Sequence, residues 1–193
     1  GIPMHKVEVD VGRIGGGFGG KEDQATMWAT LAALAAYHLC RPVKLILDRK
    51  DDMMMTGKRH PYSCDYKLGL DQDLKIVAYE ATYYQNGGAT ADLSPAVLER
   101  TLFHGTNSYD VPNATLTAHC CKTNLPSNTA FRGFGGPQGM FVLECAIHHA
   151  ARELGIPAFQ IQQKNLLTAS SVFPYGQQAE EAKAEECWLK AIT

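Results

Sequence analysis

The chain has 193 residues, of which 45% are hydrophobic and 20% charged, a composition typical of folded globular proteins. Eighteen basic and twenty acidic residues give a net charge of -2 with no basic stripe, which gives no electrostatic support to a nucleic acid or an anionic membrane as partner. The six cysteines include no CxxC pair and no apolar run reaches the ~18 residues of a membrane span, so we expect free thiols, a cytoplasmic location and no iron–sulfur ligands.

The first third of the chain predicts two strands on either side of a helix. Valines alternate with acidic residues over 7–11, which is strand periodicity. Residues 24–40 are rich in alanine, leucine and methionine and are apolar over most of the circumference, which predicts a buried helix. Residues 43–47 then predict a buried strand that ends at Asp48, and a polar connection follows.

The rest of the chain mixes strands and helices. Alternation over 62–70, a turn at 71–73 and a returning strand at 74–84 predict an antiparallel hairpin. The remaining expected elements are a helix at 95–103, a strand at 115–121, a helix at 140–154 opened by Pro137 and stopped by Gly155, a helix from Pro157 to about Leu167, and a last helix at 179–191. This pattern argues for an α+β or mixed α/β fold.

Glycine is the unusual residue, because nine of the 18 glycines fall in the windows 15–20 and 133–139. In the first window, Gly15, Gly17 and Gly20 have the GxGxxG spacing of a dinucleotide loop, with Asp48 as the candidate ribose ligand. The same window almost forms a P-loop, but Glu22 stands where a magnesium-binding Ser or Thr belongs. The first loop alone therefore leaves open a Rossmann-type NAD-binding dehydrogenase.

The second window repeats the plan of the first. Each places an aromatic residue, Phe18 or Phe134, between glycines just ahead of a predicted helix. Glycines let the backbone approach a flat or anionic ligand closely, and a phenylalanine can supply a stacking face. Parallel strands at 7–11 and 43–47 would favour the dehydrogenase, whereas Phe18 and Phe134 on one face would count against it.

Two long segments of the sequence, one around each glycine window, resemble a known family. The segments RIGGGFGGKE (13–22) and KTNLPSNTAFRGFGGPQ (122–138) resemble the two signature segments of xanthine dehydrogenases, in the part that holds molybdopterin. Further matching stretches are 41–43, 47–49, 57–61, 86–88 and 164–166. The resemblance fades after about Gln178, so residues 1–178 are expected to form part of a molybdopterin-binding catalytic region and 179–193 to begin a following segment.

The resemblance implies a set of cofactor contacts. Backbone amides of the first loop would donate to the molybdenum centre, and the second loop would approach from the other side. The pterin dithiolene holds the metal in this family, so no side-chain metal ligand is expected, and the metal would lie near the two loops. The implied contact residues are Gly17, Phe18 and Gly19 in the first loop and Ala130, Phe131 and Arg132 in the second.

The resemblance also implies a reaction, the oxidation of hypoxanthine and xanthine to urate. In it, a metal-bound hydroxide attacks a purine carbon and hydride passes to a sulfido ligand, while Phe134 stacks on the substrate. Glu22 and Arg100 would be the catalytic and substrate-binding pair at the purine edges, where a guanidinium in a dry site lowers the barrier by about 3 kcal/mol. Related aldehyde oxidases carry uncharged residues at these two places and remain an alternative. A surface ion pair with Glu99 or Asp92 is the other interpretation of Arg100.

The resemblance also implies that other groups needed for catalysis lie outside this chain. The family's catalytic chain is several times longer, its general base is a glutamate near the far C-terminus, and its 2Fe–2S and FAD groups lie in other domains or subunits. We therefore expect this chain to be a fragment that works with the rest of its own subunit in a dimeric assembly. The final electron acceptor, NAD or oxygen, is decided in the flavin part. By itself the fragment is expected to bind no cofactor and to be inactive.

Overall fold

The computed structural model describes residues 1–192, and Thr193, the end of the expected final segment, lies outside the described residues. Helices and strands are mixed along the chain, which confirms the expected fold class. In chain order the elements are the 3-10 helix η1 (Met4–Lys6), α1 (Gln24–Leu39), α2 (Arg49–Met55), β1 (Tyr62–Leu70), β2 (Ile76–Gly88), α3 (Ser94–Phe103), β3 (Ala114–Lys122), α4 (Gly136–Leu154), α5 (Ala158–Lys164) and α6 (Ala184–Ile192).

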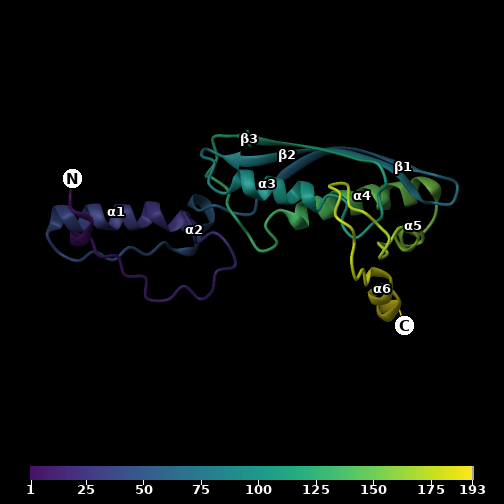
Figure 1. Cartoon of the computed structure of the whole chain (residues 1–193). Coiled ribbons are helices and arrows are strands. Elements are labelled where there is room, and N and C mark those ends of the chain that lie inside the picture. The colour runs from purple at the N-terminus through teal and green to yellow at the C-terminus, as the bar shows by residue number, and fades with distance from the viewer. Residues whose placement is uncertain (193) are drawn as a thin grey trace.

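A sheet of three strands in the order β1-β2-β3 forms one layer of the molecule (Figure 1). The antiparallel pairing of β1 with β2 runs from Tyr62 opposite Gln85 to Leu70 opposite Ile76, which confirms the predicted hairpin. β3 pairs with β2 in parallel, and α3 is the crossover between them. The crossover sets α3 against the sheet and leads from the buried Gly88 to the start of the helix at Ser94.

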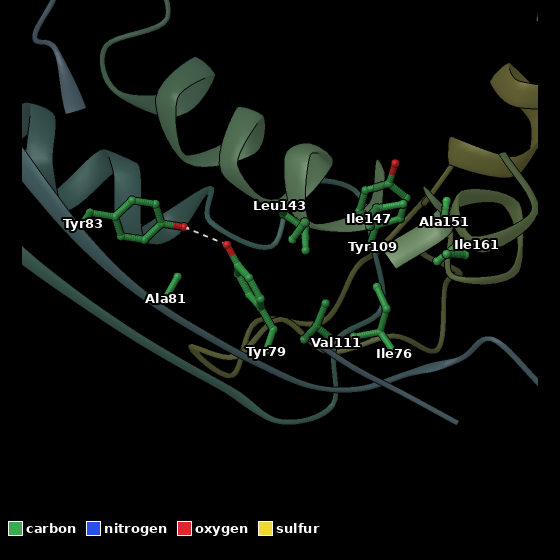
Figure 2. Packing of buried hydrophobic residues seen from close by; sticks show 11 residues of the cluster. Ile76, Tyr79, Ala81, Tyr83, Tyr109, Val111, Leu143, Ile147, Ala151 and Ile161 are labelled. Carbon is green, nitrogen blue, oxygen red and sulfur yellow. Dashed lines mark hydrogen bonds between the residues drawn. The ribbon is translucent and has the colours of Figure 1, made fainter. Parts of the chain in front are cut away.

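The core lies between this sheet and the helices α4 and α5. Figure 2 shows its members, with Tyr79 and Tyr83 of β2 pointing toward Leu143 and Ile147 of α4. All four side chains are at most 1% exposed. The two tyrosine hydroxyls lie 3.4 Å apart, and burial raises the pKa of Tyr83 to about 12. The core thus fixes the sheet and α4, the helix that follows the second glycine loop.

The N-terminal region, residues 1–59, is different, because none of its residues is buried. In Figure 1 this region, which we call the arm, carries α1 away from the end of the sheet. The helix α1 forms where predicted, but the expectation that it is buried is wrong: Met27, Leu31 and Leu34 are 51%, 47% and 53% exposed. No second layer of the described chain covers this helix.

The two strands predicted in the arm are also absent. Residues 7–11 and 43–47 are extended or irregular, and neither segment joins a sheet within residues 1–192. Alternating or continuous apolar residues make a strand only where another strand accepts their backbone hydrogen bonds. The expected polar connection contains the short helix α2, which Asp48 caps by accepting from Asp51 N at 2.8 Å.

All six cysteines are free, as predicted. Among residues 1–192, no helix combines the length and the apolar character that crossing a membrane requires.

Candidate functional site

The two glycine loops share the positive φ values of one Phe–Gly step. In the first loop Phe18 has φ 48° and Gly19 has φ 105°; in the second, Phe134 has φ 51° and Gly135 has φ 96°. A positive φ is unfavourable for phenylalanine, so the turn is held in both loops by the contacts around it. Within the second loop, Phe134 N donates to Phe131 O at 2.7 Å. The repeated Phe–Gly sequence therefore has the same left-handed step in both loops, whereas the next glycine differs: Gly20 has φ 75° and Gly136 begins α4.

The structure brings the two loops together. Arg132 N donates to Phe18 O at 2.9 Å, which links the loops through their backbones. Gly19 faces the second loop so closely that an added Cβ would lie 2.8 Å from Phe131 Cα. Only a glycine permits this approach. The rings of Phe18 and Phe134 make no contact with each other among the described aromatic pairs, so the loops meet through the backbone and not through their rings.

Several backbone donors of these loops are available for a ligand. Within the described residues, the N–H groups of Gly17, Phe18 and Gly19 donate to no protein acceptor, and the same holds for Phe131. The side chain of Phe18 is 64% exposed, and Lys21 Nζ donates to Gly17 O at 2.9 Å. Successive N–H groups in left-handed turns form a concave anion-binding surface.

Arg59 belongs to this site, although the sequence analysis did not single it out. Its guanidinium carbon lies 4.6 Å from the centre of the Phe131 ring, and Nη2 donates to Arg132 O at 2.7 Å. A weaker bond at 3.4 Å runs from Nη1 to Gln138 Oε1. Arg59 thus supports the second loop and its following helix. The only sequence signal was its place in the matching stretch 57–61, since no spacing relates it to residue 131.

Glu22 and Arg100 lie on different elements and do not bond to each other. Glu22 is exposed just before α1 and accepts from Lys21 N at 2.9 Å. Arg100 is exposed on α3, and within residues 1–192 it forms no ion pair, so the alternative of a surface pair with Glu99 or Asp92 is wrong.

The helix that carries Arg100 contacts the second loop. Thr101 Oγ1 donates to Gly135 O at 3.1 Å, and an added Cβ on Gly135 would lie 2.8 Å from the same hydroxyl. One turn after Arg100, burial and then the Arg100 charge lower the pKa of His104. The helix of Arg100 is therefore packed against the turn that contains Phe134.

No group of three or more His, Cys, Asp or Glu side chains suited to a metal ion occurs among residues 1–192. The site consists of backbone amides, two phenylalanines and separated charges. Its free amides can donate to the polar atoms of a ligand.

Comparisons with known proteins agree with this geometry. Residues 1–166 match the Molybdopterin cofactor-binding domain family. The chain is 45% identical over 192 residues to the mouse protein named xanthine dehydrogenase/oxidase, and 47% identical over 188 residues to the rice protein named xanthine dehydrogenase. These matches cover 100% and 97% of the chain but only 14% of each relative.

The fold matches solved structures as well. An aldehyde oxidoreductase from Desulfovibrio gigas superimposes with a TM-score of 0.80 and 28% identity, over 92% of this chain and 20% of that one. Quinoline 2-oxidoreductase from Pseudomonas putida 86 superimposes with a TM-score of 0.76 and 26% identity, over 92% of this chain and 24% of that one. The dinucleotide loop is excluded because the parallel strands around it are missing. The family match extends over more than half of the chain, which therefore belongs to the Molybdopterin cofactor-binding domain family.

Proposed function

We propose that this domain supplies two walls of the active site of a molybdenum hydroxylase that oxidises hypoxanthine and xanthine to urate. The observation that carries the proposal is the contact of the two glycine loops, in which Gly19 lies against Ala130 and Phe131 while the amides beside it stay free. High identity to relatives named xanthine dehydrogenase supports it along the whole chain.

The residues present fit a molybdopterin cofactor. Gly17, Phe18 and Gly19 offer N–H donors on one loop, and Ala130, Phe131 and Arg132 form the facing segment. In this proposal the loops hold the cofactor from two sides with backbone groups, and no side chain binds the metal. When bound, the cofactor supplies the oxygen atom and takes up the two electrons of the oxidation. The loops exclude water from one side of it and fix its orientation.

The substrate would lie between an aromatic face and two charged edges. We assign the stacking face to Phe134, whose unusual turn is held against α3. Arg100 would donate to the purine edge where negative charge accumulates in the transition state, and Glu22 would accept from ring N–H groups. The absence of a protein partner for Arg100 within residues 1–192 supports this assignment, because its guanidinium is available to a ligand.

An aldehyde substrate is the second candidate, favoured by the structural match to the aldehyde oxidoreductase of D. gigas. The two candidates differ in what binds at Glu22 and Arg100. A purine needs hydrogen-bonding charged groups there, whereas an aldehyde does not. We favour the purine because both positions are charged in this chain.

The test uses the full-length enzyme with Arg100→Met combined with Glu22→Val. We expect kcat/KM for xanthine to fall about 100-fold or more while that for an aromatic aldehyde is kept or rises. The matched control is Arg152→Met combined with Glu185→Val, both at exposed positions outside the loops, on α4 and α6. Unchanged xanthine turnover in the Arg100 and Glu22 variant would refute the assignment of the purine edges.

The proposal also implies partners. The general base, the 2Fe–2S and FAD groups and the site of the final electron acceptor would be provided by the rest of the subunit or by further subunits, in a dimeric cytoplasmic assembly. Free thiols at all six cysteines are consistent with that compartment.

A further inference from the structure

One carboxylate, that of Asp92, joins three separate parts of the candidate site. Asp92 lies two residues before α3, next to its N-cap Leu93, and has φ 46°, a left-handed conformation that few residues adopt. Its Oδ2 accepts from Gln24 Nε2 at 2.7 Å. Its Oδ1 accepts from Thr129 Oγ1 at 2.5 Å and from Leu93 N at 2.6 Å. Both oxygens of the side chain are therefore engaged by donors.

Each partner borders one part of the site. Gln24 is the first residue of α1 and follows the first glycine loop, and Thr129 is the residue before Ala130 of the second loop. An added Cβ on Gly20 would lie 3.4 Å from Thr129 Cγ2, so the loops also touch at this point. The amide of Gln24 is itself fully used, since Oε1 accepts from Gly57 N at 3.0 Å and Nε2 also donates to Ser127 O at 3.2 Å.

We propose that Asp92 is a positioning residue that sets the two glycine loops and the helix of Arg100 in one arrangement. This inference rests on the proposed function for its catalytic meaning, but its structural content is independent of the reaction. Asp92 forms no hydrogen bond with residues 15–20 or 130–136. It acts through its bonds to Gln24, Thr129 and the backbone of Leu93.

The arrangement requires a carboxylate. An amide at position 92 has one acceptor and one donor end. If its oxygen faces Leu93 N and Thr129, its NH2 group faces the NH2 group of Gln24. If the Gln24 amide is flipped, its NH2 group faces the N–H of Gly57. If the new amide at position 92 is flipped instead, its NH2 group faces the N–H of Leu93. One donor is left facing another in every orientation, so at least one hydrogen bond is always lost.

The test is Asp92→Asn in the full-length protein, read out by molybdenum per subunit and by hydrogen exchange at two bonded amides, Gly57 N, which donates to Gln24, and Arg132 N, which donates to the first loop. We expect exchange at both amides to accelerate about 10- to 100-fold, because the charge-assisted bonds of Asp92 that hold this arrangement are lost or reversed. Molybdenum content should fall with it. Asp65→Asn, the same change at an exposed strand residue whose carboxylate has no hydrogen bond within residues 1–192, should leave both quantities at their wild-type values.

Two further variants keep the inference testable if Asp92→Asn folds poorly. Thr129→Val removes only the hydroxyl donor, so exchange at Arg132 should rise while exchange at Gly57 changes less. Gln24→Glu alone sets two carboxylates at the 2.7 Å contact and should loosen the first loop. Combined with Asp92→Asn, the new carboxylate at position 24 accepts from the new amide and from Gly57 N, so protection should be partly restored. A merely additive loss in this double variant would contradict a positioning role.

Exchange and molybdenum content separate the two ideas. Wild-type exchange in Asp92→Asn would overturn the role of Asp92, whether or not molybdenum is lost. A wild-type enzyme that contains no molybdenum would overturn the proposed function, while accelerated exchange at Gly57 and Arg132 in Asp92→Asn would still support the role of Asp92.

Discussion

The arm, residues 1–59, and the rest of the described chain, which we call the body, differ in how much of their side chains they bury. The body, residues 60–192, buries Tyr79, Tyr83, Leu143, Ile147 and Ile161 between a sheet and helices, whereas residues 1–59 bury nothing. The arm nevertheless carries the first glycine loop, and the body carries the second. The site therefore joins a region that has its own core to a region held by a few polar contacts.

The difference shows which contacts place the first loop. The apolar side chains of α1 remain exposed, so they do not fix the arm. The arm is fixed by three sets of contacts: the junction of Gly19 with Ala130, the bond from Arg132 N to Phe18 O, and the bonds of Gln24. Since the chain spans 14% of the length of its curated relatives, we expect another part of the full-length subunit to cover α1.

The largest effect is expected from Gly19→Ala, which breaks the junction between the two regions. The new Cβ would lie 2.8 Å from Phe131 Cα, and φ 105° is unfavourable for alanine. We expect a loss of about 3 kcal/mol or more in the closed arrangement of the loops, and a matching loss of molybdenum in the full-length protein. Metal analysis of the purified variant measures it. Gly12→Ala, in open space on the same arm, is the control, and equal molybdenum in the two variants would argue against the junction.

Leu143→Ala tests the body. The side chain is 0% exposed within the core of α4 and the sheet. Truncation should lower the free energy of unfolding by about 3 kcal/mol, from lost burial and the cavity that remains. Urea unfolding of the 193-residue chain measures the difference. A loss below about 1 kcal/mol would mean that the core relaxes around the gap or that the body is not the stable unit.

The buried His60 should make the stability of the body depend on pH. Burial lowers the pKa of His60, although the Asp92 charge acts in the opposite direction, and Nε2 lies 2.7 Å from Ser94 Oγ. The unfolded chain takes up this proton near pH 6.5, before the native protein does, so stability is greatest above that pH and falls as the pH drops through it. In His60→Gln this part of the decrease should disappear. Parallel stability curves for the two proteins between about pH 5 and 7.5 would refute it.

The smallest effect is expected from Leu34→Ala in the arm. Leu34 is 53% exposed on α1, and alanine is at least as good a helix former. Unfolding of the 193-residue chain should change by less than about 0.5 kcal/mol. In the full-length protein the same change should destabilise more, if α1 is covered there. A loss equal to that of Leu143→Ala in the isolated chain would remove the distinction between arm and body.

Local signals made much of the body predictable from sequence. The hairpin followed from alternation on either side of the turn at 71–73, and α4 from Pro137 at its start and Gly155 at its end. The parallel pairing of β2 with β3 was not predicted, because it depends on where α3 packs and not on any local pattern. The strands expected at 7–11 and 43–47 failed for the same reason, since their residues have no strand to pair with.

The candidate site was predictable only in part. The clustering of glycines in the sequence identified both loops, and the repeated Phe–Gly segment was correctly expected to precede two helices. Arg59 and Asp92 were missed, because their partners lie far away in sequence: Arg132 is 73 residues from Arg59, and Gln24 is 68 residues from Asp92. Contacts of this kind are created by the fold and have no signature in spacing.

The position of molybdenum in crystals of the full-length protein, located by its anomalous scattering, decides whether the two glycine loops form the cofactor site. We expect the metal beside residues 15–20 and 130–136, near the free N–H groups of Phe18 and Gly19. Molybdenum bound remote from both loops, or purine oxidation by a preparation without molybdenum, would contradict it.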